Sequence, residues 1–170
     1  IDVVSEIFIR INLQGKPLNQ EDFAMYKISV NEQYDGDRIR NTIDYFCHLL
    51  KDPAFISVLE KNEPAFMASD YGKNLTWIGE DPSFNYVPSY SDFLKVVLIA
   101  YFGKTKVGDL VNLLSGKTSK RGEISKKLSE ESFHKLAEGV KAFACEENFL
   151  GFADAIDKAG YCCQRLMYSQ

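Results

Sequence analysis

The chain has 170 residues, a formal net charge of −4, 45% hydrophobic residues and 26% charged residues. This composition is that of a globular protein with a buried core, and the length fits one domain. No apolar run approaches the roughly 20 residues of a membrane helix, and the four cysteines, without a C-x-x-C spacing, indicate a reducing compartment. We therefore expect a cytoplasmic protein that does not contact a membrane.

The first predicted elements are two helices joined by a turn within residues 8–22, FIRINLQGKPLNQED. Asn12 stands at the end of an amphipathic helix, Gly15 can adopt positive φ, and Pro17 stops the helix from continuing. Asn19 then caps a second helix over residues 19–30.

The turn carries a recognisable motif, F-x-x-I-N-x-x-G-x-x-L, formed by Phe8, Ile11, Asn12, Gly15 and Leu18. Followed by an acidic helix start, it resembles the ParB-like family that includes the GmrSD-type restriction endonucleases. In that family the motif follows a nucleotide-handling D-G-Q-Q-R sequence, which these 170 residues do not contain. The resemblance implies that residues 1–30 end a ParB-like core and residues 31–170 form a helical extension, so that the chain is a fragment of a larger protein. It also implies that Asn12, Gln14 and Gly15 close one side of a nucleotide pocket; a purely structural turn is the alternative.

Helical signals continue through the middle of the chain. A stripe at helical spacing predicts one apolar face between residues 39 and 50: Ile39, Ile43, Phe46, Cys47 and Leu50. A short helix restarts at Asp52-Pro53. Residues 63–90 hold scattered prolines, glycines and aromatic residues, so we expect a long irregular loop packed by its own rings, or one containing a short helix.

The second half of the chain predicts four more helices. An apolar helix over residues 91–102 is expected to be buried on most sides, and a short one over 107–114 ends at Gly116. A long helix opens at Ser129, and a last one runs from Glu146 to a stop at Gly160. Because no segment alternates like a strand, we predict an all-α fold: a compact multi-helix domain spanning residues 1–170 with one long irregular loop.

Positive charge is concentrated in residues 104–127, which contain seven basic and two acidic residues. Five of them are candidates for a surface that contacts nucleic-acid phosphates: Lys117, Lys120, Arg121, Lys126 and Lys127. One arginine and no interleaved aromatic ring indicate phosphate contact rather than sequence readout. The alternative is a solvated loop that keeps an acidic protein in solution.

The sequence offers no convincing catalytic or metal site. The two histidines are far apart, and the carboxylate pairs stand where helices are expected to begin. Gly116-Lys117-Thr118 lacks the earlier glycine of a phosphate-binding loop, since that position is Val111. We expect no catalytic residue, metal or cofactor in this segment, whereas the resemblance implies a nucleoside triphosphate with Mg²⁺ for the parent protein.

By resemblance, we expect a non-catalytic helical segment of a nucleotide-dependent DNA nuclease, of the restriction or phage-defence kind. Its partners would be DNA and the upstream ParB-like domain, whose active centre it braces. The alternative is a helical protein-interaction module with no nucleic-acid role, using the aromatic residues of 63–90 as its surface. A third interpretation places those rings in the core: Phe66, Tyr71, Trp77, Phe84, Tyr86 and Tyr90.

Overall fold

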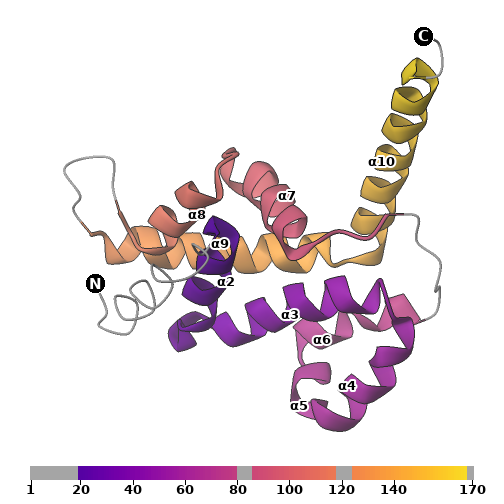
Figure 1. The fold of residues 1–170 in the computed structure, drawn as a ribbon. Coiled ribbons are helices and arrows are strands. Elements are labelled where there is room, and N and C mark those ends of the chain that lie inside the picture. Colours follow the sequence, from indigo (N-terminus) through magenta and orange to yellow (C-terminus); the bar gives the residue numbers. More distant parts are fainter. Residues whose placement is uncertain (1–18, 80–85, 118–123, 168–170) are drawn as a thin grey trace, which may run out of the picture.

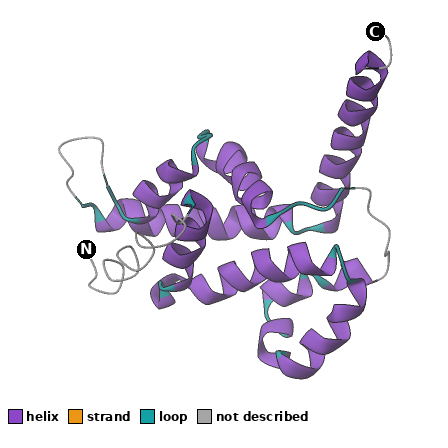
Figure 2. Cartoon of the chain, in the orientation of Figure 1, coloured by secondary structure: helices purple, strands orange, loops and turns teal. Residues whose placement is uncertain are grey.

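A computed structural model of the chain describes residues 19–79, 86–117 and 124–167, with only the helical backbone described for 161–167. Helices joined by short loops make up this part of the chain (Figure 2). Its only strand-like pairing is an isolated bridge between Lys117 and Ile124. The predicted all-α class is confirmed.

The first described helices are α2 (Gln20–Ser29) and α3 (Gly36–Leu49), separated by the 3₁₀ turn η1 (Glu32–Tyr34). The predicted cap is confirmed, because the Asn19 side chain accepts the Asp22 backbone N–H at 2.6 Å. At the next turn Asp35 adopts the left-handed conformation, and a Cβ at Gly36 would lie only 2.0 Å from the Ile28 carbonyl oxygen. All five residues of the predicted α3 stripe are buried.

The segment expected to be irregular contains several short helical turns. After η2 (Pro53–Phe55) and α4 (Ile56–Asn62) come α5 (Pro64–Met67), α6 (Asp70–Lys73) and η3 (Thr76–Gly79). Prolines at the first positions of η2 and α5 suit these starts, because proline has no N–H to leave unpaired. Of the two arrangements expected for residues 63–90, the structure therefore has the loop that contains short helices.

Two helices follow, α7 (Tyr90–Phe102) and α8 (Val107–Leu114). Ser89 and Asp92 form a reciprocal capping box at the start of α7. The expectation that α7 is buried on most sides was wrong. Phe93 and Val97 are buried in the core, but Ile99 is 55% exposed. The apolar residues of α7 therefore extend onto the surface.

The last helices are α9 (Lys126–Phe143) and α10 (Glu146–Met167), and both correct the predicted boundaries. α9 begins before Ser129, because Ser125 caps it and accepts the Leu128 N–H at 3.2 Å. α10 does not stop at Gly160 but continues through it to Met167. Nothing lies within 4 Å of a Cβ built at Gly160, so no tertiary contact ends the helix there.

α9 lies across the middle of the molecule, with α7 and α8 on one side and α3 on the other (Figure 1). α2 contacts both α8 and α3, while α4, α5 and α6 lie beyond α3. The beginning of α10 packs against this body and its remainder projects away from it. The core centres on four rings whose centroids lie 4.9–6.0 Å apart: Phe46, Phe93, Phe143 and Phe149.

Candidate functional site

The family motif lies outside the described residues. This applies to the whole set predicted for the nucleotide pocket and its turn: Phe8, Ile11, Asn12, Gln14, Gly15 and Leu18. The basic segment is described in part, with Lys120 and Arg121 outside it and Lys117, Lys126 and Lys127 inside it.

The three described lysines meet where α8 ends and α9 begins. Gly116, at φ 69°, turns the chain after α8, and its carbonyl accepts the Ser125 N–H at 2.8 Å. The Lys117–Ile124 bridge extends this pairing by one step. Ser129 adds a tertiary contact, because its hydroxyl donates to the Leu114 carbonyl at 2.6 Å. We call the region around Lys117, Lys126 and Lys127 the basic end.

All three side chains at the basic end are exposed. Lys127 lies 3.8 Å from Glu131, but its side chain is 85% exposed, so this ion pair contributes little. The first turn of α9 contains no acidic residue. Lys104 and Lys106 precede α8 and therefore stand at its other end, about 12 Å away along the axis of an eight-residue helix. The basic residues thus form two groups rather than one continuous patch.

Residues considered for catalysis or metal binding lie apart. Within the described ranges, no three His, Cys, Asp or Glu residues are grouped as metal ligands. His48 packs edge-on against Phe55 at 4.3 Å, and His134 lies 6.0 Å from Tyr34. The expectation that Glu130-Glu131 open a helix was wrong, because α9 has already begun at Lys126.

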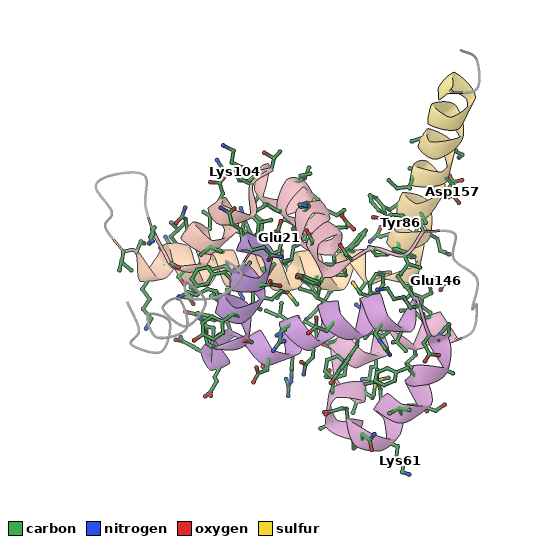
Figure 3. The ribbon with its side chains drawn as sticks, viewed as in Figure 1. Glu21, Lys61, Tyr86, Lys104, Glu146 and Asp157 are labelled. Atoms are coloured by element: carbon green, nitrogen blue, oxygen red, sulfur yellow. The ribbon has the colours of Figure 1, made fainter. Side chains whose placement is uncertain are left out.

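The described aromatic residues of segment 63–90 mostly pack inward. Phe66 and Tyr71 are buried, and Trp77 donates its indole N–H to the Ala144 carbonyl at 3.0 Å. Tyr86 lies beside α10, 5.8 Å from the Phe152 ring (Figure 3). Phe84 lies outside the described residues. These placements favour the core interpretation of the rings over a partner-binding surface.

A groove of about 360 Å³ lined by both charged and aromatic side chains, which we call the α2–α3–α7 groove, was not predicted from the sequence. Asp22, Tyr26, Arg40, Asp44 and Tyr90 are among the residues that line it. The Tyr90 hydroxyl donates to Asp22, and this hydrogen bond, with burial, raises the pKa of Tyr90. Burial raises the pKa of Asp44, and Arg40, 3.4 Å away, opposes that shift.

A second, apolar groove of about 230 Å³ lies between α7 and α9. Val96, Tyr101 and Phe143 contribute to its walls, and Asn148 from α10 stands at its margin. No side chain near it suggests chemistry.

No family model, curated protein or solved structure matches this chain. Within the described ranges, none of the helices combines the length and apolar character that a bilayer span requires. In the part of the chain that the structure describes, an all-α fold thus carries an exposed basic end and the two grooves named above.

Proposed function

We propose that the chain is a binding segment of a larger protein and that its basic end contacts nucleic-acid phosphates. The observation that carries this proposal is the meeting of Lys117, Lys126 and Lys127 at the α8–α9 junction. Lys120 and Arg121 belong to the same predicted set and fall between them in the sequence, outside the described residues. Positive charge at an exposed site is the main requirement for sequence-independent phosphate binding.

The resemblance supplies the larger setting of this proposal. The parent would be a nucleotide-dependent DNA-cleaving protein of the restriction or phage-defence kind. The upstream ParB-like domain would hold the nucleoside triphosphate and Mg²⁺, while residues 8–22 brace that centre. The role of this chain is to hold DNA, and the chemistry belongs to the rest of the parent.

The test is binding of fluorescent duplex DNA, followed by anisotropy at two salt concentrations. With three phosphates neutralised, the slope of log K against log salt is about −2.7, so a rise from ~50 to ~200 mM lowers the affinity roughly 40-fold. A slope near zero would contradict phosphate contact. No binding at the lower concentration would remove the DNA role from this chain.

A matched pair of variants locates the contact. Lys117, Lys126 and Lys127 are changed together to Glu; at the start of α9, glutamate also suits the helix dipole, so folding is preserved. The control changes the exposed Lys51, Lys61 and Lys73 to Glu, with the same effect on net charge. Lys61 lies on the far side of α3 from α8 and α9 (Figure 3). We expect binding to be lost in the first variant and kept in the second.

A second candidate function is protein interaction through α10. At about 1.5 Å per residue its 22 residues span roughly 33 Å. Its apolar stripe begins with Phe149 and Phe152, which pack against Phe143, and continues at helical spacing to Ile156, which is 37% exposed. If the chain does not bind DNA at low salt, this extended stripe becomes the favoured functional surface.

A further inference from the structure

The α2–α3–α7 groove carries an inference that is independent of the basic end. It lies where three helices meet: Asp22 and Tyr26 come from α2, Arg40 and Asp44 from α3, and Tyr90 from the first position of α7. Its volume of about 360 Å³ falls in the range of small-molecule sites. Asp22 is the last residue of segment 8–22, which the resemblance assigns to bracing the active centre, and none of the lining residues belongs to the basic end.

The charges of the groove favour a cation. The charged lining consists of two carboxylates, Asp22 and Asp44, and one guanidinium, Arg40, so it is net negative. Tyr90 occupies one oxygen of Asp22, and Arg40 lies 3.4 Å from one oxygen of Asp44. Within the described ranges, the contacts of these two side chains use only one oxygen of each carboxylate. With respect to the described residues, each aspartate therefore has an oxygen left to accept from a ligand.

One neighbouring pair of charges adds nothing to the net negative charge of the lining. Glu21, the next residue along α2, lies 3.7 Å from Lys95 of α7, so these two groups largely neutralise each other. A phosphate-bearing ligand would meet two carboxylates and one already paired arginine, which disfavours it.

Tyrosine side chains supply the second feature, an aromatic lining. Tyr26 and Tyr90 both line the groove. The face of a tyrosine ring attracts organic cations, and Met25 adds an apolar surface for a short hydrocarbon chain. Carboxylates beside aromatic rings suit an alkylammonium or guanidinium group better than a metal ion, which needs several oxygen, nitrogen or sulfur ligands.

We infer that the α2–α3–α7 groove binds a small organic cation, an alkylammonium or guanidinium group on a short aliphatic chain. Asp44 and Asp22 are its counter-ions, Tyr26 and Tyr90 provide aromatic contact, and Arg40 sets the position of the Asp44 carboxylate. The cation can come from a free polyamine or from an arginine side chain of a protein, since both present the same chemistry.

The test titrates the whole chain with agmatine, which carries a guanidinium and an amine at opposite ends of a four-carbon chain. Isothermal titration calorimetry measures the affinity, and we expect a Kd on the order of 1 mM or tighter. Two compounds of similar length serve as controls: the neutral 1,4-butanediol and the anionic succinate. N-acetyl-arginine amide, titrated in parallel, separates an arginine side chain from a free polyamine as the source.

Three variants assign the site. Asp44→Asn removes one counter-ion and should weaken agmatine binding at least tenfold. Asp22→Asn tests the second counter-ion separately and should also weaken agmatine binding. Its amide oxygen still accepts the Tyr90 hydroxyl, so only the charge is lost. Glu60→Gln, an exposed change on α4 outside the groove, is the matched control and should bind as the wild type does. Circular dichroism checks that each variant is folded.

The outcomes separate clearly. Binding of agmatine or of the arginine amide, lost in folded Asp22→Asn or Asp44→Asn and kept in Glu60→Gln, supports the site and identifies its source. Equal binding of 1,4-butanediol, full affinity in both aspartate variants, or no binding of either cation at several times the expected Kd overturns it. DNA binding at the basic end can fail or succeed without changing any of these results.

Discussion

The packing of α7 on α9 depends on Gly139, and replacing it with alanine tests how close that contact is. A Cβ at position 139 would lie 2.6 Å from Val97 Cγ1 and 2.9 Å from Tyr101 Cδ2. Non-bonded carbon atoms prefer about 3.5–4.0 Å, so the neighbours must move by roughly 1 Å. Val97 is fully packed and branched at Cβ, which limits its freedom to move.

Two opposing effects set the change in the free energy of unfolding of Gly139→Ala. Alanine is favoured over glycine inside a helix by about 1 kcal/mol, while overpacking typically costs about 1–3 kcal/mol. Gly139→Ala should therefore lower the free energy of unfolding by roughly 0–2 kcal/mol. Gly151→Ala, within α10, has nothing within 4 Å of the new Cβ and should raise it by up to about 1 kcal/mol.

Urea unfolding followed by circular dichroism measures both variants. Both variants gain the same helix propensity, so the difference between their free energies of unfolding is the cost of overpacking, about 1–3 kcal/mol. In thermal melting, each kcal/mol corresponds to roughly 2–4 °C in Tm. Gly139→Ala being as stable as Gly151→Ala, or more so, would refute the argument. It would mean that α7 can move away from α9 without loss of packing.

Three further changes probe the core and one cap. Phe93→Ala should lower the free energy of unfolding by about 3–5 kcal/mol, because the ring is fully buried between Phe46 and Phe143; a loss under about 1 kcal/mol in urea unfolding would contradict that packing. Ser89→Ala should cost about 0.5–2 kcal/mol by thermal melting, because the capping box of α7 is lost; an unchanged Tm would show that the cap is dispensable. With the other three cysteines changed to Ser, Cys47 should react with a thiol reagent at pH 8 only after urea unfolds the chain. Burial raises the pKa of this thiol to about 12, so roughly one molecule in 10⁴ is thiolate at that pH; rapid reaction of the folded chain would show that Cys47 is accessible.

Local signals were sufficient to predict many helices, because the groups that begin a helix stand next to it in the sequence. Asn19 is such a case, since its cap partner is only three residues away. The α3 stripe was predicted for a similar reason: its 3.6-residue period is visible without knowing what covers it.

The two wrong boundaries have different causes. Ser129 has the residue type of a cap, but its hydroxyl bonds to Leu114, fifteen residues earlier, and Ser125 caps α9 instead. Gly160 has the residue type of a helix stop, yet α10 continues through it with no neighbour to disfavour a helical glycine. The Ser129 boundary depends on Leu114, which is near it only in space, whereas no tertiary contact explains why α10 continues through Gly160.

The α2–α3–α7 groove was beyond prediction for a stronger reason. Asp22 and Tyr90 are 68 positions apart, and nothing in either local sequence indicates the other. The proximity of the three described lysines of the basic end could be predicted because they are close in sequence. Their separation from Lys104 and Lys106 could be seen only once the intervening helix α8 was placed.

Trp77, the single tryptophan of the chain, lies at the junction between α9 and α10, so its intrinsic fluorescence reports on that junction. Its indole N–H bonds to Ala144 at the end of α9, and its ring lies 5.9 Å from Phe149 near the start of α10. Indole emission responds to a change in its hydrogen bonding or hydration. A partner that swings α10 will therefore shift the intrinsic fluorescence of the unlabelled protein, whereas a ligand held only at the basic end will leave its wavelength unchanged.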